Sequence, residues 1–259
     1  MLYPTPVAHV AHFIAYLSLN NKSINTVRSY TAAITWLHRI NLWPNPTSSF
    51  IITKLLKGLE RSNSQTRDKR LPITYERLII LLNLLPSICY NEYETILFTA
   101  AFTMAFYGFL RISELLGDIS GGYNGIQTHH ITLNEIITLF IGHSKTDQSQ
   151  KGTIIQIKPV PRCNFCPLRA LHSYLKIRPR LITTTQLFIH ANGNPLTHPQ
   201  LRAVLSKAAV AAGWPADRFT SHSFRIGAAT TAAIHGHSDE FIMKKGRWAS
   251  DAMKTYIRM

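Results

Sequence analysis

Apolar residues recur every three to four positions along the first sixty residues of the chain, which is the spacing of one face of an α-helix. This pattern predicts three helices, over residues 7–19, 24–40 and 50–60. Ser23 is placed to cap the second helix, and Pro44-Asn45-Pro46 is typical of a turn before the third. We therefore expect a small helical unit at the N-terminus.

The pattern disappears between residues 63 and 71, where the sequence NSQTRDKRL is polar, charged and without periodicity. Such a stretch is typical of a linker between domains. We therefore predict two domains, over residues 1–66 and 72–259.

Helical spacing resumes after the linker and is interrupted once by a change of period. Residues 121–160 contain short alternating runs rich in β-branched residues, QTHHITL, EIITLFIG and GTIIQIKPV, which indicate a small antiparallel sheet. A further short strand is expected at residues 187–190. The remaining segments predict helices over residues 75–85, 92–109, 167–178, 201–212, 223–234, 238–245 and 250–258. The expected fold class is mainly α with a small antiparallel β-sheet (α+β).

The composition excludes some classes of protein and favours one class of partner. The chain has 259 residues, of which 46% are hydrophobic, and contains no uninterrupted apolar run long enough to span a membrane. Lys and Arg number 28 against 13 Asp and Glu, a formal charge of +15. This excess favours a polyanionic partner, with nucleic acid ahead of an anionic membrane surface. An ordinary basic protein without such a partner is the alternative.

The three cysteines are too few and too uneven in number for a disulfide framework, which indicates a reducing, intracellular compartment. Cys163 and Cys166 have the spacing of half a zinc site, but no second pair completes it. We therefore predict no metal site and no cofactor.

Basic residues on the N-terminal helices and in the linker are candidates for contact with a phosphate backbone. Each also fits an ordinary solvated helix face. The candidates are Lys22, Arg28, Lys54, Lys57, Arg67, Lys69 and Arg70.

The candidate chemistry lies in the second domain. Arg111 ends an apolar helix, and a cation there needs a partner, either Glu114 three residues on or a bound phosphate. His222 and Arg225 lie one helical turn apart, and Tyr256 is close to the end of the chain. A histidine, arginines and a tyrosine without matching carboxylates suggest chemistry on a phosphate.

These residues, in this order and with this spacing, resemble the tyrosine recombinase (phage integrase) family. The resemblance rests on Arg111-Ile112-Ser113-Glu114-Leu115, Lys145 in a turn between strands, His222-Ser223-Phe224-Arg225, Gly246-Arg247-Trp248 and Tyr256. It covers residues 72–259 and, more loosely, the helical unit as a SAM-like core-DNA-binding domain. The stretches GFLRISEL, SKTDQ, SFRIGAATTAA and GRWASDAM are most similar to recombinases of DIRS-like retrotransposons and Cryptons.

The resemblance implies a DNA strand-exchange enzyme that works without metal through a 3′-phosphotyrosine intermediate. It makes Tyr256 the nucleophile, Arg111 and Arg225 the phosphate clamp, His222 a proton carrier and Lys145 the acid for the leaving 5′ oxygen. The implied partners are double-stranded DNA and other copies of the chain, as a tetramer on DNA, with no membrane. A eukaryotic source would imply the nucleus.

This chain differs from the family pattern in two places. Family members usually have His or Trp directly after the glycine and about nine residues before the tyrosine. Counting back from Tyr256, or forward from Gly246, leads to Arg247, whereas counting forward from Arg225 favours Trp248. Both residues are therefore candidates. The chain also ends three residues after Tyr256 and begins close to its first helix. We therefore expect a fragment or a decayed copy of a mobile element.

Two other functions fit the same residues. A type IB topoisomerase-like enzyme uses similar chemistry, although the helical unit and the short hairpin favour a recombinase. A catalytically inactive or domesticated DNA-binding protein would keep the fold, but the complete set of candidate catalytic residues argues against it.

Overall fold

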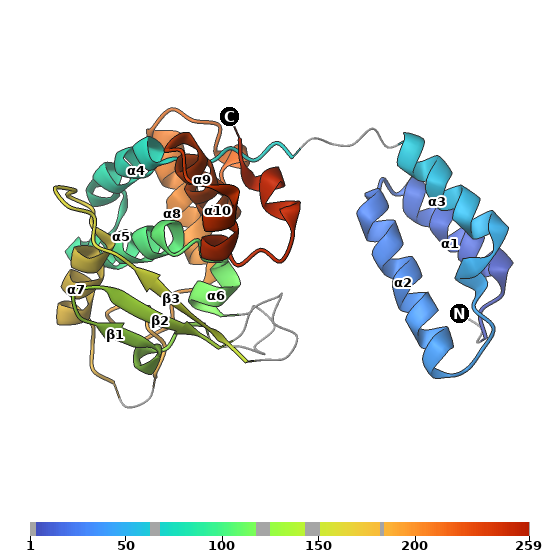
Figure 1. Cartoon of the computed structure of the whole chain (residues 1–259), viewed down its shortest axis with the longest axis horizontal. Coiled ribbons are helices and arrows are strands. Elements are labelled where there is room, and N and C mark those ends of the chain that lie inside the picture. Colours follow the sequence, from blue (N-terminus) through green and yellow to red (C-terminus); the bar gives the residue numbers. More distant parts are fainter. Residues whose placement is uncertain (1–3, 63–67, 118–124, 143–150, 182–183, 259) are drawn as a thin grey trace. The chain divides into compact units, whose positions relative to one another are not determined.

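The computed structural model describes residues 4–62, 68–117, 125–142, 151–181 and 184–258. It divides into two compact units, residues 1–69 and residues 70–259 (Figure 1). Among the described residues, no helix has both the length and the hydropathy to cross a membrane.

Unit 1 contains the three expected helices, α1 (Val7–Leu19), α2 (Ile24–Ile40) and α3 (Phe50–Ser62), with a short 3-10 helix, η1 (Pro46–Ser48), before α3. The Ser23 hydroxyl accepts a hydrogen bond from the backbone N–H of Thr26 at 3.2 Å, as expected of a helix cap. The core is small and consists of Val10, Ile14, Leu17, Val27 and Ile52.

A buried histidine adds polar contacts to this small core. His38 is fully buried in α2, and its Nδ1 lies 2.7 Å from the Pro44 carbonyl oxygen. Its Nε2 accepts a hydrogen bond from the backbone N–H of Thr5 at 3.2 Å. The ring therefore connects the N-terminal segment to the turn that precedes α3.

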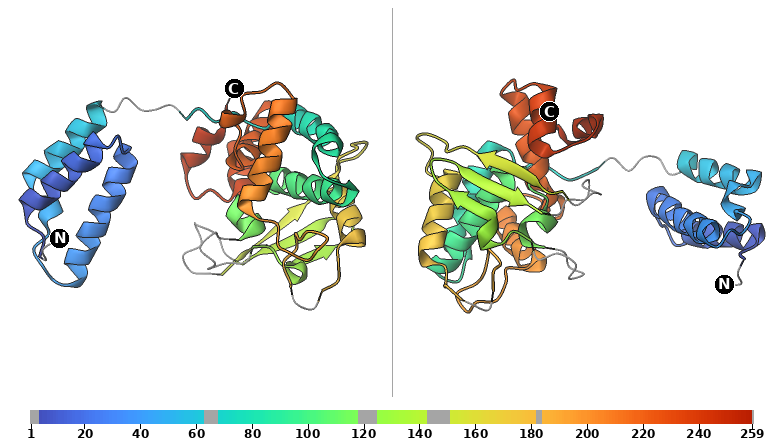
Figure 2. Two further views of the ribbon diagram at one scale, coloured as in Figure 1. Left: turned by 180° about the vertical axis from the view of Figure 1, so that it is seen from behind. Right: turned by 60° about the horizontal axis from the view of Figure 1, so that its bottom comes forward.

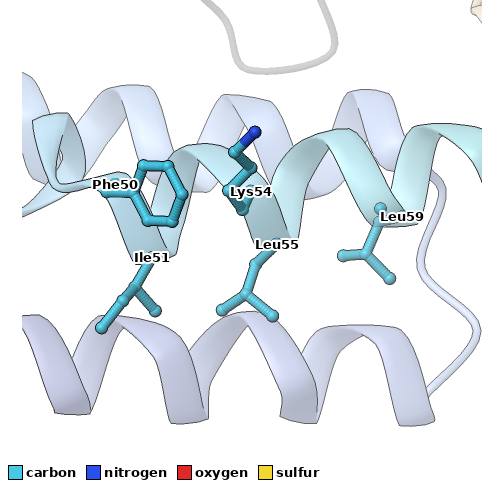
Figure 3. Close-up of a pocket in the computed structure, with 6 residues that line it drawn as sticks. Phe50, Ile51, Lys54, Leu55 and Leu59 are labelled. Carbon is cyan, nitrogen blue, oxygen red and sulfur yellow. The ribbon is translucent and has the colours of Figure 1, made fainter.

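One side of α3 is apolar and open to solvent. Phe50 and Ile51 are 75% and 58% exposed. Together with Lys54, Leu55, Gly58 and Leu59 they line a shallow depression of about 500 Å³ (Figure 3). Unit 1 thus buries only one face of its third helix.

Unit 2 is mainly helical with a small antiparallel sheet, as the sequence predicts. Its elements are α4 (Tyr75–Ile88), α5 (Glu92–Tyr107), α6 (Ile112–Leu116), η2 (Thr128–His130), β1 (Ile131–Leu133), β2 (Ile137–Ile141), β3 (Thr153–Ile157), α7 (Pro167–Ile177), α8 (His198–Ala211), η3 (Ala216–Arg218), α9 (His222–Ile234), α10 (Asp239–Gly246) and η4 (Asp251–Tyr256).

Helix α5 is the centre of the core in unit 2. Residues 100–106 of this helix are all buried, which explains why no amphipathic stripe is visible in its sequence. β2 lies between β1 and β3, and alternate residues Ile137, Leu139 and Ile141 join the same core. Figure 2 shows the sheet covering one side of unit 2, with α7 beside it.

One local prediction in unit 2 is wrong. Residues 187–190 form no regular strand, since only an isolated bridge joins Ile189 to Pro195. The backbone bonds instead to several separate segments. The N–H of Leu187 donates to the Ile126 carbonyl, the N–H of Leu196 donates to the Phe188 carbonyl, and the Tyr174 hydroxyl lies 3.0 and 3.1 Å from the Leu187 and Ile189 carbonyl oxygens. The short helix predicted over residues 250–258 is present as a six-residue 3-10 helix, η4.

The segment that enters unit 2 lies directly against α9. The backbone N–H of Ile73 donates to the Ser223 carbonyl at 3.0 Å, and that of Tyr75 to the Thr231 hydroxyl at 3.0 Å. A Cβ atom at Gly227 would overlap the Ile73 carbonyl group, so this close approach requires glycine. These contacts hold in place the helix that carries His222 and Arg225.

Candidate active site

Arg111 is presented by a sharp turn of the chain after α5. Phe109 has a left-handed backbone conformation with φ of 49°, and Arg111 then caps the short helix α6. The backbone N–H of Arg111 donates to Glu114 Oε2 at 2.8 Å, and its Nη1 donates to Oε1 at 2.7 Å. The expected ion pair with Glu114 is therefore present, and it also closes the first turn of the helix.

Arg247 reaches the same carboxylate from the far end of the sequence. It follows α10 in a left-handed conformation with φ of 56°, and its Nη2 lies 2.6 Å from Glu114 Oε2. Its guanidinium also donates to the carbonyl oxygens of Gly108 and Phe109, each at 3.3 Å. Glu114 thus joins two arginines that are more than a hundred residues apart.

The electrostatics of this cluster keep the carboxylate ionised. The Glu114 side chain is only 1% exposed, and burial by itself raises the pKa of a carboxyl group. The charge of Arg247 and the hydrogen bonds and charge of Arg111 outweigh burial, so the pKa of Glu114 lies below its ordinary value.

Arg225 is fully buried on α9, at the centre of the site. It donates hydrogen bonds to the carbonyl oxygens of Phe109 and Gly246. Its guanidinium carbon lies 4.2 Å from the centre of the Trp248 ring, a cation–π distance. Burial, followed by the nearby charge of Arg111, lowers the pKa of Arg225 to about 9. A bound anion would offset both effects.

Tyr256 lies in an aromatic cluster beside this guanidinium. The centre of its ring is 5.1 Å from that of His222 and 4.9 Å from that of Trp248. The Arg225 guanidinium carbon is 5.8 Å from the Tyr256 ring. Four residues predicted to be catalytic from three separate segments therefore meet at one place.

The segment around Tyr256 is anchored by a residue that the sequence did not indicate. The hydroxyl of Thr230, which is buried in α9, donates to the Tyr256 carbonyl at 3.3 Å. It also accepts a hydrogen bond from the backbone N–H of Arg258 at 3.0 Å. A threonine among small residues of an apolar helix carries no distinctive signal in the sequence.

Trp248 has two roles in the structure. Its ring belongs to the buried core of unit 2, and a Cβ atom at Gly246 would overlap it. Its indole nitrogen is buried without a hydrogen-bond partner among the described residues. The ring is therefore packed as a core residue, and its one polar atom is a buried donor without a protein acceptor in the described part of the chain.

The other predicted residues lie outside this cluster or outside the described residues. Lys145, between β2 and β3 in the sequence, lies outside the residues that the structure describes. Arg67, between α3 and α4, lies outside them as well. Arg28 forms an exposed ion pair with Glu60 at 2.8 Å. Lys22, Lys54, Lys57 and Lys69 are exposed, and Arg70 is half-buried.

No cluster of three or more metal-binding side chains occurs among the described residues. Cys163 and Cys166 are both buried. The hydroxyl of Tyr75 donates to Cys163 Sγ at 3.4 Å, and the backbone N–H of Val160 donates to Cys166 Sγ at 3.3 Å. The two thiols thus have protein hydrogen-bond partners at the start of α7.

Comparison with known proteins identifies the second unit. Residues 82–258 match the model of the phage integrase family. An integrase/recombinase xerD homolog from Selenomonas ruminantium is 26% identical over 217 residues. The match covers 81% of this chain but only 60% of that protein, so the chain is considerably shorter than this relative.

Solved structures share the fold at low sequence identity. The XerH site-specific recombinase, bound to its palindromic difH substrate in a post-cleavage complex, has a TM-score of 0.70 at 18% identity, covering 98% of this chain and 69% of XerH. The Tn1549 transposon integrase in complex with circular intermediate DNA has a TM-score of 0.65 at 15% identity, covering 98% and 81%. A λ integrase dimer bound to a core site has a TM-score of 0.63 at 15% identity, covering 99% and 65%.

Proposed function

Because the chain belongs to the phage integrase family, we propose that it cuts and rejoins DNA through a covalent bond between Tyr256 and a 3′ phosphate. The observation that carries this proposal is the meeting of Tyr256, His222 and Trp248 around the buried guanidinium of Arg225. A tyrosine that served only packing would not require a buried cation beside it, because burying a charge is costly.

In the proposed cleavage step, the phenolic oxygen of Tyr256 attacks the scissile phosphorus. A bond forms between phosphorus and this oxygen, and the bond to the 5′ oxygen breaks. The phenol must lose its proton as it attacks, since an unperturbed tyrosine ionises only near pH 10. His222, whose ring lies beside that of Tyr256, is the proposed acceptor of this proton.

The arginines stabilise the charge that develops on the phosphate. Planar guanidinium groups suit the nonbridging oxygens of a phosphate, and Arg111 and Arg225 are the proposed clamp. Arg225 is already held by two backbone carbonyls, so its position is set before DNA arrives. A preorganised donor of this kind does not have to be reoriented during the reaction.

Lys145 is the proposed acid that protonates the leaving 5′ oxygen. Rejoining reverses the step: a 5′ hydroxyl from another strand attacks the phosphotyrosine, and the phenol leaves. The phosphodiester energy is kept in the covalent intermediate, so we propose that neither a metal nor a high-energy cofactor is needed.

The proposed partners are double-stranded DNA and further copies of the chain. The chain has a formal charge of +15, which favours a polyanion. The XerH and Tn1549 structures contain DNA, and the λ integrase structure is a dimer on DNA. By analogy we propose assembly on DNA, up to the tetramer that strand exchange between two sites requires.

A nicked suicide substrate tests the proposal, because loss of a short 5′ fragment traps the covalent intermediate. We expect an adduct that resists SDS with the unmodified protein and none with Tyr256→Phe, while DNA binding stays nearly unchanged. Tyr90→Phe is the matched control, since Tyr90 is 96% exposed and should form the adduct normally. An adduct in the Tyr256→Phe variant would refute the assignment.

The same assay separates the other two functions. DNA binding by the unmodified protein without any adduct would indicate an inactive DNA-binding protein. Relaxation of supercoiled DNA by the monomer, without a second site, would indicate a topoisomerase-like enzyme.

We further propose that the chain derives from a eukaryotic mobile element and acts in the nucleus. The support is the amino-acid sequence of three stretches, GFLRISEL, SFRIGAATTAA and GRWASDAM, which resembles that of DIRS-like and Crypton recombinases. Sequencing the flanks of the gene tests this source, because a bacterial operon or prophage on both sides would contradict it.

A further inference from the structure

We infer that Arg247 is a positioning residue that neutralises Glu114, and that it does not itself bind the scissile phosphate. The inference rests on the proposed function, since it concerns the same phosphate site. It assigns different roles to the two neighbours in Gly246-Arg247-Trp248. The guanidinium of Arg247 bonds to the protein, whereas the indole N–H of Trp248 has no acceptor among the described residues.

The contacts of Arg247 show how its guanidinium is used. Nη1 donates to the carbonyl oxygens of Gly108 and Lys245, at 3.3 and 3.2 Å. Nη2 donates to Phe109 O at 3.3 Å and to Glu114 Oε2 at 2.6 Å. Each of these nitrogens carries two N–H groups. Both therefore have as many protein acceptors as they have hydrogens to donate.

Burial agrees with this assignment. The Arg247 side chain is 9% exposed, and its Nε is buried without a partner among the described residues. Burial lowers the pKa of the guanidinium, and the charge of Glu114 acts in the opposite direction. A cation kept in such surroundings needs a fixed counterion, which Glu114 supplies.

Charge balance explains why the site needs this second arginine. Glu114 holds Arg111 in place through both its backbone and its side chain, but a lone carboxylate would cancel the charge of Arg111. With Arg247 included, this group of three side chains has a net charge of +1, and Arg225 adds a second positive charge. The phosphate, which becomes more negative during the reaction, then meets a positive site.

The backbone supports the same division of roles. Arg247 is in the left-handed region, and the N–H of Trp248 donates to the Met243 carbonyl at 3.0 Å. These features close the end of α10 and seat the Trp248 ring over Arg225. Arg247 therefore fastens this corner to residues 108–114 at the same time as it compensates Glu114.

A double-mutant cycle tests the inference through the rate of adduct formation on nicked DNA. We expect Arg247→Met to slow this rate about 100-fold, with DNA affinity changed less than about threefold. The double variant Arg247→Met plus Glu114→Gln should react at least about tenfold faster than Arg247→Met, because it no longer contains the uncompensated carboxylate. If Arg247 binds the phosphate itself, the double variant will react no faster than Arg247→Met, and the inference is overturned.

Two controls keep the result interpretable. Arg202→Met removes one exposed positive charge on α8. It should leave unchanged the rate at which DNA-bound protein forms the adduct. Arg247→Lys retains the charge and should react faster than Arg247→Met. If the Met variant does not fold, the comparison of Arg247→Lys alone with Arg247→Lys plus Glu114→Gln replaces it. In this pair the added glutamine should bring no gain, because the lysine already compensates the carboxylate, and a tenfold gain would overturn the inference.

Failure of the proposed function would be visible separately. If the unmodified protein forms no adduct, the proposed reaction is wrong, and the cycle is then measured by thermal unfolding. Coupling between Glu114→Gln and Arg247→Met in the melting temperature would still support mutual compensation, whereas additive changes would refute it.

Discussion

The ring of Trp248 lies 4.9 Å from the ring of Tyr256, at an angle of 56°. The same indole covers the guanidinium of Arg225 and keeps its N–H buried without a partner among the described residues. An unsatisfied buried donor lowers stability, so a ligand oxygen that reaches it gains a full hydrogen bond. This relationship connects packing in the core to the proposed chemistry at Tyr256.

Replacing Trp248 by Phe separates the ring from its N–H group. We expect Trp248→Phe to slow adduct formation on nicked DNA by about 10- to 100-fold, because one donor to the phosphate is lost. Trp248→His retains a donor, and its rate of adduct formation should lie between those of the unmodified protein and Trp248→Phe. Trp214→Phe is the control, since Trp214 packs against Phe219 and should react normally. An unchanged rate for Trp248→Phe would show that the indole only packs.

Two glycines in helices give opposite predictions on substitution by alanine. Gly246→Ala places a methyl group where the Trp248 ring lies, and we expect it to lower the free energy of unfolding of unit 2 by about 1–3 kcal/mol. A Cβ atom at Gly58 in α3 would meet nothing within 4 Å, so Gly58→Ala should stabilise unit 1 by about 0.5–1 kcal/mol. Denaturant unfolding of each variant, followed by probes in each unit, measures both effects. Tolerance of alanine at residue 246 would contradict the packing.

Glu114 makes the stability of unit 2 depend on pH in a defined direction. Its pKa is lowered in the folded protein, despite burial, by Arg247 and Arg111. The stabilisation is therefore complete above the ordinary pKa of a glutamate, and it is lost as the pH falls through the lowered pKa.

We expect Glu114→Gln to reduce the free energy of unfolding by roughly 2–3 kcal/mol at neutral pH, and by progressively less in acid. Urea unfolding between neutral and acidic pH measures this difference. Glu135→Gln, at an exposed position in unit 2, is the control and should show little effect at any pH. A Glu114→Gln difference that grows in acid would contradict the ion pairs.

The basic residues of unit 1 are predicted to act through phosphate contacts. If Lys22 and Lys57 each neutralise one phosphate, replacing either with Gln should make the slope of log affinity against log salt less negative by about 0.9. Arg28 is paired with Glu60, so Arg28→Gln should change the slope less. Affinity measured over a series of salt concentrations tests both. Equal slopes for all variants would place the DNA-binding surface elsewhere.

The periodicity of the chain determined most of the secondary structure. It predicted α1 and α2 to the residue, because their buried positions and the Ser23 cap are local features. It failed at residues 187–190, where the backbone bonds to Ile126, to residues 194–196 and to the Tyr174 hydroxyl rather than to one neighbouring strand. It also failed to distinguish an α-helix from a 3-10 helix at η4, because six residues are too few to establish a period.

The residue types available for chemistry could be identified before the fold was known, since the spacing of Arg111, His222, Arg225 and Tyr256 pointed to a phosphate site. The contacts that these side chains make could be read only from the fold. Whether Glu114 serves one arginine or two depends on how the corner after α10 packs against residues 108–114. Contacts between residues so far apart arise from the packing of whole elements, which no local pattern records. The buried Trp248 ring over Arg225, and the anchoring of the Tyr256 segment by Thr230, follow from that same packing.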